Sequence, residues 1–258
     1  MVAAYLAICL IARLGYRVLL YPAPPHDPPF QPSGDQKLLS LRADDGALVV
    51  AADPPPPDDR ARTVVVFHGN GETIGNRLPL AEGLRAHGLG VVLAEFRGYG
   101  LAAASGPPTE ASLYRDASTV LDALQSQGIG PARVALMGIS LGTGVASEMA
   151  ARGRGAALIL VSPFTSITAM ASRTLPLLPA GLLCPDHFDT LSRCGRIGVP
   201  TLVVHGDEDE VVPFSMGQQV AASIPGATLR VEHGGHHNDL FVRDPRELVD
   251  AIAEQAKR

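Results

Sequence analysis

The sequence lacks the cysteine patterns of disulfide-rich and zinc-binding proteins. It has three cysteines in 258 residues, Cys9, Cys184 and Cys194, and no C-x-x-C pair. An odd number of cysteines without metal-like spacing predicts neither a disulfide framework nor a zinc site. Cys184 and Cys194 could pair in an oxidising compartment, but two unpaired thiols are the favoured interpretation.

Clustered basic residues are also missing. The net charge is -5, and the lysines and arginines lie in segments that also carry acids. A phosphate-binding surface needs grouped cations, so we expect no nucleic-acid partner. Charged residues make up only 18% of the chain and hydrophobic residues 46%. This composition and length are typical of one catalytic α/β domain with a large core.

The longest apolar run lies at the N-terminus. Residues 1–21 carry no charge before Arg13, and Arg17 follows one helical turn later on the same face. This pattern predicts an apolar helix that anchors or associates with a membrane, on a side that the sequence does not fix. A full span is marginal because a central arginine costs about 2.5–3.5 kcal/mol. A packed helix of a cytoplasmic protein and a signal peptide without a basic leading segment are the alternatives.

The remaining chain reads as a Pro-rich linker over residues 22–35 and a folded domain over residues 36–258. The domain opens with a hairpin around Asp45-Gly46, and the run of prolines at 54–57 follows it. Continuous apolar strands alternate with amphipathic helices, which predicts the α/β class with a mostly parallel sheet covered on both faces. Residues 163–196, rich in proline, read as a short cap insertion. The expected strands are 37–41, 47–52, 63–67, 91–95, 134–137, 157–161, 201–205 and 228–231, and the expected helices include 113–124 and 245–256.

The strongest local motif is G-x-S-x-G centred on Ser140. It follows the expected strand 134–137 and precedes a helix-compatible segment, which is the context of a nucleophile elbow. Glycines at 138 and 142 leave room for a strained turn that exposes the serine hydroxyl. The motif alone arises by chance in roughly one chain of this size in ten. Its strand and helix context favours a catalytic serine over an accidental loop serine.

Two later clusters supply partners for such a serine. In this fold an acid and then a histidine follow the nucleophile along the chain. The acids at 207–210 come directly after the strand 201–205, at the carboxyl edge where open α/β sheets build their sites. Histidines at 233, 236 and 237 lie in a glycine-bearing loop after the last strand. A run of acids usually forms a solvated surface, so at most one of these acids needs a catalytic role. Likewise, only one of the histidines can act as the base.

Seven further short motifs resemble those of one protein family, and the resemblance covers residues 36–258. With the elbow, they resemble the membrane-anchored alpha/beta-hydrolase-domain serine hydrolases, within the wider serine aminopeptidase and prolyl-oligopeptidase-like group. The resemblance implies the alpha/beta-hydrolase fold and a short apolar anchor. Two segments depart from the family pattern, Glu95-Phe96 and the loop after Gly100, and both concern the rim of the site. The motifs are His-Gly-Asn at 68–70, Arg-Gly-Tyr-Gly at 97–100, Pro-Thr-Glu at 108–110, Ser-Pro-Phe-Thr-Ser at 162–166, Phe-Asp at 188–189, His-Gly at 205–206 and Val-Val-Pro at 211–213.

The resemblance implies a role for single residues. The family's acid lies two residues before a Val-Val-Pro ending, at Asp209, and its base precedes Asn-Asp, at His237; Asp207 and His236 are the alternatives. The backbone N–H groups of Asn70 and Leu141 would form the oxyanion hole.

Three other motif residues have mainly structural interpretations. For His68, Arg97 and Tyr99, shaping of the loops is favoured over a direct chemical role.

These features predict acyl transfer through Ser140, without a metal or an organic cofactor. The expected substrates are carboxylic esters or thioesters of small molecules or lipids, since an apolar N-terminus would hold the enzyme at a membrane. A serine peptidase or aminopeptidase, and a non-catalytic binding protein that kept the fold, are the alternatives. The cap insertion offers an apolar cover, for which plain packing on the sheet is the other interpretation; its members are Phe164, Leu175, Leu177, Leu178, Leu182 and Leu183.

Overall fold

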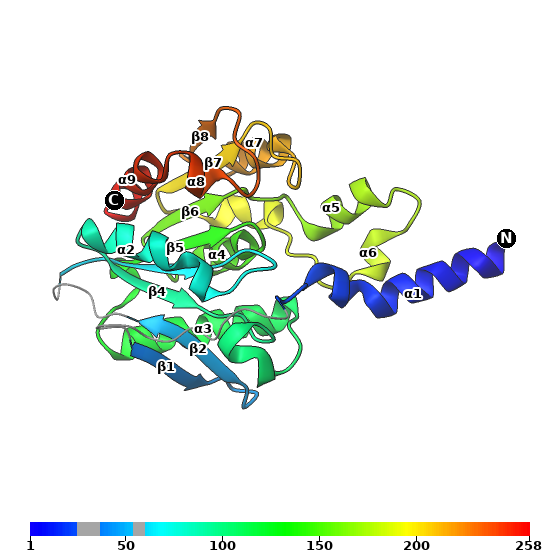
Figure 1. Cartoon of the computed structure of the whole chain (residues 1–258), viewed down its shortest axis with the longest axis horizontal. Helices are drawn as coiled ribbons and strands as arrows, with labels where there is room; N and C mark the ends of the chain where they lie inside the picture. Colours follow the sequence, from blue (N-terminus) through cyan, green and yellow to red (C-terminus); the bar gives the residue numbers. More distant parts are fainter. Residues whose placement is uncertain (25–36, 54–59) are drawn as a thin grey trace.

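The computed structural model describes residues 1–24, 37–53 and 60–258, and these residues form an eight-stranded sheet with helices on both faces (Figure 1). The strand order is β1-β2-β4-β3-β5-β6-β7-β8. β1 with β2 and β2 with β4 are antiparallel, and every other neighbouring pair is parallel. The predicted mostly parallel α/β fold is therefore confirmed. The strands are β1 (Lys37–Arg42), β2 (Leu48–Asp53), β3 (Thr63–Phe67), β4 (Gly90–Ala94), β5 (Val134–Ile139), β6 (Ala157–Val161), β7 (Thr201–Gly206) and β8 (Thr228–Glu232).

Burial along the strands explains why their sequences are continuous apolar runs. Every residue of β3, β5 and β6 is buried, because helices cover both faces of the central sheet. The edge strand β1 instead alternates between exposed and half-buried residues. The predicted hairpin turn joins β1 to β2, where Gly46 adopts φ +81° and the Ala47 N–H donates to Asp45 Oδ1 at 3.1 Å.

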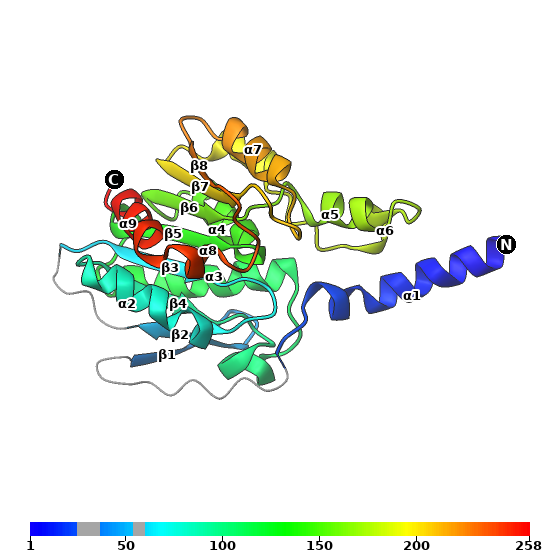
Figure 2. The ribbon, with the colours of Figure 1, turned by 45° about the horizontal axis from the view of Figure 1, so that its top comes forward.

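Two hydrophobic clusters lie on opposite faces of the sheet. Helices α3, α4 and α7 pack on one face, and α2 and α9 pack on the other (Figure 2). The predicted helix 113–124 is part of α3, and the predicted last helix is α9. The apolar face of α3 is buried at Leu113, Ala117, Val120, Leu121 and Leu124. The helices of the domain body are α2 (Leu78–Ala86), α3 (Glu110–Ser126), α4 (Leu141–Ala151), α7 (Phe214–Ser223), α8 (Leu240–Arg243) and α9 (Pro245–Ala256), with short 3-10 helices at Ile74–Arg77, Gly100–Ser105 and Pro131–Arg133.

The segment between β6 and β7 leaves the sheet and projects from one end of the molecule. It contains α5 (Ile167–Thr174), α6 (Ala180–Leu183) and a 3-10 helix at Leu191–Arg196. Both α5 and α6 stand away from the sheet in Figures 1 and 2. The expectation that all its large apolar residues cover the site was wrong for Leu177 and Leu182, which are 84% and 79% exposed. Leu177 lies in the turn between α5 and α6, Leu182 lies on α6, and both side chains face solvent.

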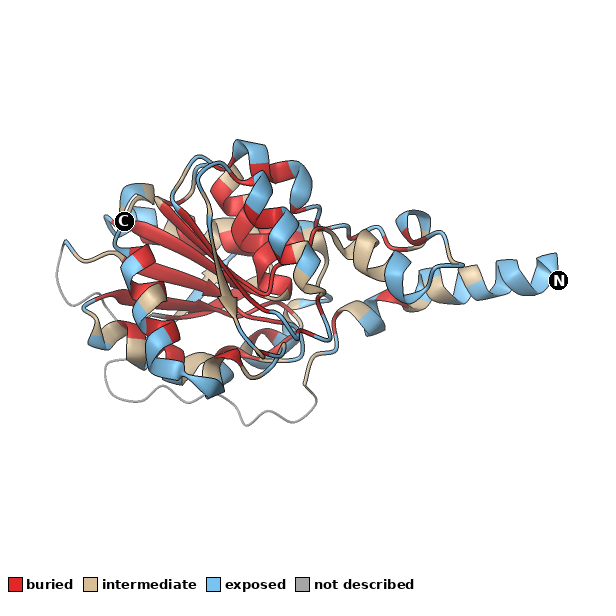
Figure 3. Ribbon diagram, turned by 90° about the horizontal axis from the view of Figure 1, so that it is seen from above, coloured by how far each residue is buried: buried red, intermediate tan, exposed pale blue. Residues whose placement is uncertain are grey.

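The N-terminal helix α1 (Val2–Leu20) extends beyond the domain alongside α6 (Figure 1). It is long and apolar enough to cross a membrane. Most of it is exposed, and Tyr16 is the one buried residue within the helix (Figure 3). The next residue, Tyr21, is buried and donates its hydroxyl to Asp186 Oδ2 at 2.9 Å. Most of the predicted linker, residues 25–35, and the prolines at 54–57 lie outside the described residues.

Candidate active site

Ser140 lies in the tight turn between β5 and α4. Its backbone adopts φ +49° and ψ -115°, a strained conformation for a residue with a side chain. The Ser140 N–H donates to Val161 O on β6 at 2.9 Å, which fixes the turn against the sheet. A Cβ at Gly138 would lie 2.4 Å from the Gly142 carbonyl oxygen, and a Cβ at Gly142 would lie 2.0 Å from Phe67 O. Both glycines of the motif are therefore required by close backbone contacts.

The structure brings together the three residues that the sequence and the family resemblance select. His237 Nε2 lies 3.0 Å from Ser140 Oγ, and His237 Nδ1 lies 2.8 Å from Asp209 Oδ2. The residues come from the elbow, the loop after β8 and the loop after β7, which meet at the carboxyl edge of the sheet. Both contacts are within hydrogen-bond distance. This is the geometry in which an acid orients a base and the base accepts a hydroxyl proton.

Asp209 is held by backbone and side-chain donors. Its Oδ1 accepts the N–H groups of Val211 and Val212 at 2.9 and 2.7 Å, while Oδ2 lies 3.3 Å from His205 Nε2. Burial by itself would raise the pKa of Asp209, but the hydrogen bonds from His205 and His237 hold it well below its usual value. Asp209 is therefore ionised. Sequence reasoning missed His205, although a histidine at a strand end four residues before the acid is a usable signal.

The alternative acid and base lie elsewhere. Asp207 contacts His233, with Oδ2 2.8 Å from His233 Nδ1, at an exposed position. His236 Nδ1 lies 3.3 Å from Glu210 Oε2, also near the surface. Neither residue of the alternative pair contacts Ser140 in the described part of the chain. His236 and His237 are adjacent in the sequence, but of the two only His237 lies within hydrogen-bond distance of Ser140 among the described residues.

Asn70 and Leu141 line the same cavity as Ser140. Leu141 is the first residue of α4, so its N–H has no acceptor within the helix. The Asn70 side chain fixes its loop from two sides. Tyr99 donates its hydroxyl to Asn70 Oδ1 at 2.7 Å, and Asn70 Nδ2 donates to Leu20 O at 2.7 Å. Tyr99 thus touches the loop through Asn70, in agreement with a loop-shaping role.

His68 is buried beneath the Asn70 loop. Its Nε2 accepts the Phe96 N–H at 3.2 Å and lies 3.1 Å from Glu95 Oε1. Its Nδ1 lies 2.7 Å from Gly69 O. His68 does not line the cavity around Ser140. These contacts close the loop onto the segment after β4.

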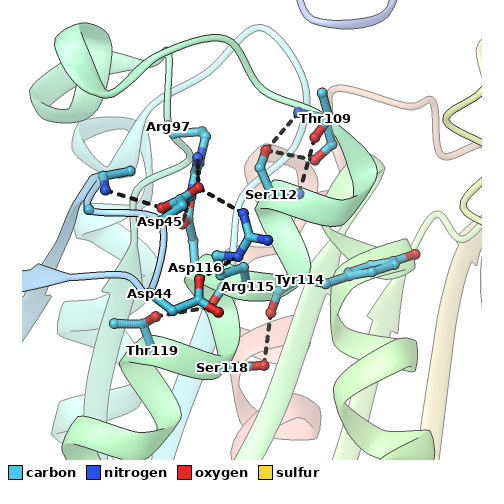
Figure 4. A network of polar contacts seen from close by, with 12 residues as sticks. Asp44, Asp45, Arg97, Thr109, Ser112, Tyr114, Arg115, Asp116, Ser118 and Thr119 are labelled. Carbon is cyan, nitrogen blue, oxygen red and sulfur yellow. Dashed lines mark hydrogen bonds and ion pairs between the residues drawn. The ribbon is translucent and has the colours of Figure 1, made fainter.

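A second buried group joins three elements next to this loop (Figure 4). Arg97 donates to Asp116 on α3 at 2.7 Å and to Asp45 of the hairpin turn at 2.8 Å. The Arg97 and Asp116 side chains are only 7% and 6% exposed. Hydrogen bonding to Asp116 raises the pKa of Arg97, whereas burial raises the pKa of Asp116. The group holds the Arg-Gly-Tyr-Gly loop in place and does not line the cavity.

The cap is joined to α3 through Glu110. This carboxylate accepts the hydroxyl of Tyr114 at 2.7 Å, the N–H of His187 at 2.7 Å and a guanidinium N–H of Arg193 at 2.9 Å. Burial alone would raise the pKa of Glu110, but the Phe188 backbone and these donors lower it. An ionised Glu110 therefore binds the cap to the domain.

A cavity of about 950 Å³ opens above Ser140 and His237. It is close to the upper limit of about 300–1,000 Å³ typical of small-molecule sites. The described residues that line it are mostly apolar and come from α1, α2, the cap, α8, α9 and the loops at the carboxyl ends of the strands. Among them Glu72 is the one carboxylate, and it pairs with Arg77 and accepts the Gly69 N–H. Within the described residues, no group of three or more His, Cys, Asp or Glu could hold a metal ion.

Three kinds of comparison bear on this site. Residues 58–183 match the family described as serine aminopeptidase, S33. The chain is 37% identical over 191 residues to an uncharacterised protein of Mycobacterium tuberculosis, covering 73% of this chain and 67% of the relative. It is 34% identical over 198 residues to human alpha/beta hydrolase domain-containing protein 17B, covering 75% and 67%.

Solved structures agree with the fold. The Pyrococcus furiosus esterase Pf2001 superposes with a TM-score of 0.75 at 19% identity, covering 92% of this chain and 98% of that one. Est1E from Butyrivibrio proteoclasticus has a TM-score of 0.71 at 19% identity, covering 86% and 99%.

Fold and comparisons together define a hydrolase of the alpha/beta-hydrolase fold. The chain belongs to the alpha/beta-hydrolase-domain family that includes human alpha/beta hydrolase domain-containing protein 17B.

Proposed function

We propose that this hydrolase cleaves carboxylic esters or thioesters through an acyl-enzyme on Ser140. The observation that carries the proposal is the continuous line of contacts from Ser140 Oγ to His237 Nε2 at 3.0 Å and from His237 Nδ1 to Asp209 Oδ2 at 2.8 Å. Such a line makes a serine hydroxyl nucleophilic, because the base takes its proton and the acid stabilises the resulting cation. Asp209 is suited to this task since it is ionised.

The reaction proceeds in two halves. His237 Nε2 takes the Ser140 hydroxyl proton while Oγ forms a bond to the carbonyl carbon of the ester. The oxyanion then accepts the N–H groups of Asn70 and Leu141, each worth about 10²- to 10³-fold in turnover. The carbon–oxygen or carbon–sulfur bond breaks, and His237 gives its proton to the departing alcohol or thiol. Water then gives a proton to His237 Nε2 as its oxygen forms a bond to the acyl carbon. The bond between Oγ and this carbon breaks, the acid leaves, and His237 returns the proton to Ser140 Oγ.

The cavity favours an ester over the amino terminus of a peptide. An aminopeptidase needs a free carboxylate to bind the substrate ammonium group. Glu72 is already paired with Arg77 and with a backbone N–H. An acyl ester needs only an apolar wall and the oxyanion donors, and both are compatible with the lining of this cavity. We therefore infer an acyl substrate, with lipid esters as the leading class.

The proposal includes membrane association through residues 1–21. The 19 residues of α1 extend about 28 Å at 1.5 Å per residue, close to the roughly 30 Å hydrocarbon core of a bilayer. Leu6, Leu10 and Leu14 form an exposed apolar row on this helix. Arg13 and Arg17 lie in its second half, where long side chains can reach the interface. The alternative is a cytoplasmic protein whose helix makes no bilayer contact.

Vesicle flotation tests the membrane part. The wild type should float with phosphatidylcholine vesicles, and a Leu6→Asp/Leu10→Asp variant should remain largely in the dense fraction. Each buried aspartate costs about 2.5–3.5 kcal/mol in a bilayer. Lys37→Asp in the edge strand is the charge-matched control. A wild type that does not float would support the cytoplasmic alternative.

Covalent labelling tests the chemistry. Purified protein in detergent is exposed to a fluorophosphonate probe, and hydrolysis of p-nitrophenyl butyrate is followed in parallel. We expect labelling and turnover in the wild type, and loss of both in Ser140→Ala and His237→Ala. His236→Ala is the matched control and should keep both activities. Folded wild type that is not labelled would favour a non-catalytic binding protein, and cleavage of aminoacyl p-nitroanilides but not esters would favour a peptidase.

A further inference from the structure

One face of α1 lines the same cavity as Ser140. Ala12, Tyr16 and Leu20 follow one another at intervals of four, which places them on a single side of a helix. The buried Tyr16 is in the middle of this face. Val18, on another side of the helix, is 77% exposed and does not line the cavity. The helix thus presents one face to the site and another to its surroundings.

The carboxyl-terminal end of α1 is fixed to the site by two hydrogen bonds. The carbonyl of Leu20, which has no partner within the helix at this position, accepts the Asn70 side-chain N–H at 2.7 Å. The hydroxyl of Tyr21 donates to Asp186 Oδ2 at 2.9 Å, and Asp186 Oδ1 accepts the Glu110 N–H at 3.1 Å. The same end of the helix is therefore joined to the Asn70 loop, to the cap and to α3.

The cap, whose α6 packs beside α1, forms another wall of the cavity. Met170, Leu175, Leu178 and Leu183 line the cavity from α5, α6 and the turn between them. The hydroxyl of Tyr5 donates to the carbonyl of Leu177 at 2.9 Å, which ties the first half of α1 to the same cap. Both walls are mostly apolar, with Tyr16 on α1 and Thr174 on the cap as the polar side chains among their lining residues. A flexible hydrocarbon chain would fill such a space, whereas a polar chain would lose its hydrogen bonds to water.

We propose that the face of α1 formed by Ala12, Tyr16 and Leu20 is one wall of an acyl-chain site, which makes the enzyme selective for esters of long-chain acids. This inference rests on the proposed ester hydrolysis. The ester carbonyl would lie at Ser140 and the acyl chain would extend between α1 and the cap. Each buried methylene group contributes about 0.8 kcal/mol, which is about fourfold in kcat/KM where it binds fully. The N-terminal helix would then have two roles, membrane association and binding of the substrate's acyl chain.

A pair of matched substitutions on α1 tests this assignment. Ala12→Phe adds a ring on the cavity face, and Val18→Phe adds a ring on the outward face. p-Nitrophenyl acetate, octanoate and palmitate are assayed in one detergent at one concentration. We expect wild-type kcat/KM to rise with chain length. Ala12→Phe should lower kcat/KM for palmitate at least about tenfold, mainly through KM, since it excludes several methylene groups. Hydrolysis of acetate by Ala12→Phe should fall much less than hydrolysis of palmitate, and every rate of Val18→Phe should change less than about twofold.

The acetate reaction reports that Ala12→Phe is folded and that its Ser140 is reactive. Leu178→Trp narrows the site from the cap side and should produce the same selective loss on palmitate, so the test does not depend on one variant. An unchanged chain-length profile in both variants, with acetate hydrolysis intact, would overturn the acyl-chain site alone. A folded wild type that hydrolyses none of the three esters would overturn the proposed function, and the acyl-chain site with it.

Discussion

Replacement of Asp209 by asparagine is expected to remove most activity while leaving the fold intact. Oδ1 accepts the Val211 and Val212 N–H groups at 2.9 and 2.7 Å, so the new amide must keep its oxygen at this position. Its NH₂ group then occupies the position of Oδ2, 2.8 Å from His237 Nδ1. Because NH₂ is a donor, His237 must accept at Nδ1 and carry its proton on Nε2. Nε2 lies 3.0 Å from Ser140 Oγ and in this tautomer cannot take the serine proton.

The size of the effect follows from the wrong tautomer. In a serine triad this change lowers kcat by about 10⁴-fold, which corresponds to about 5.4 kcal/mol of transition-state stabilisation. The assay is kcat for a p-nitrophenyl ester together with the rate of fluorophosphonate labelling. Circular dichroism in parallel checks that the variant is folded. Asp207→Asn is the isosteric control, and its kcat should remain within about threefold of wild type because Asp207 contacts His233 instead.

Two results would refute this reasoning. A folded Asp209→Asn variant with kcat within tenfold of wild type would show that the carboxylate does not set the tautomer of His237. A larger loss in Asp207→Asn than in Asp209→Asn would assign the acid to the other carboxylate. Either result would also remove the main support for the hydrogen-bonded line at Ser140.

Three further predictions concern the fold around the site. Gly142→Ala should prevent accumulation of folded protein, since its Cβ would lie 2.0 Å from a carbonyl oxygen of β3. Gly195→Ala is the control and should fold normally, because its Cβ would meet no atom within 4 Å. Soluble yield and thermal unfolding are measured for both variants. Asp116→Asn should lower the free energy of unfolding, measured by urea denaturation, by about 3–5 kcal/mol, because Arg97 loses a buried charged partner. The double variant Arg97→Met/Asp116→Leu should recover much of this lost stability. Ionised Glu110 should stabilise the fold above about pH 4.5, which is the pKa of this glutamate in the unfolded chain. Because its pKa is lowered in the folded protein, this contribution should be lost as the pH falls through the folded pKa. The free energy of unfolding in urea, measured from about pH 6 to 3, should therefore decline less steeply in Glu110→Gln.

The parts of the fold that were predictable from the sequence are those set by local patterns. Continuous apolar runs identify β3, β5 and β6, because a strand covered on both faces carries mostly apolar side chains. The elbow is visible because two backbone contacts exclude side chains at 138 and 142. The acid and base clusters are visible because parallel strands end at one edge of the sheet.

The parts that were missed depend on contacts distant in sequence. Nothing near Ala12 indicates that it borders a cavity built around Ser140, since the two are brought together only when the cap and α1 are in place. His205 contacts Asp209 across a turn, and its position at the strand end four residues before the acid was the one local sign of this contact. Leu177 and Leu182 look like core residues by type, but both are exposed to solvent on the cap, Leu177 from a turn and Leu182 from α6. Residue type alone could not distinguish these cases.

The outward face of α1 determines how the purified protein will behave. Leu6, Leu10 and Leu14 are 60%, 58% and 75% exposed, and no described residue covers them. In aqueous buffer such a row associates with any apolar surface available, including the same row on another molecule. We expect preparations without detergent to elute as large, concentration-dependent species, and detergent to return them to one copy per micelle. Because the opposite face of this helix borders the cavity, rates measured on the two preparations will differ, and detergent concentration becomes a variable of the enzyme assay itself.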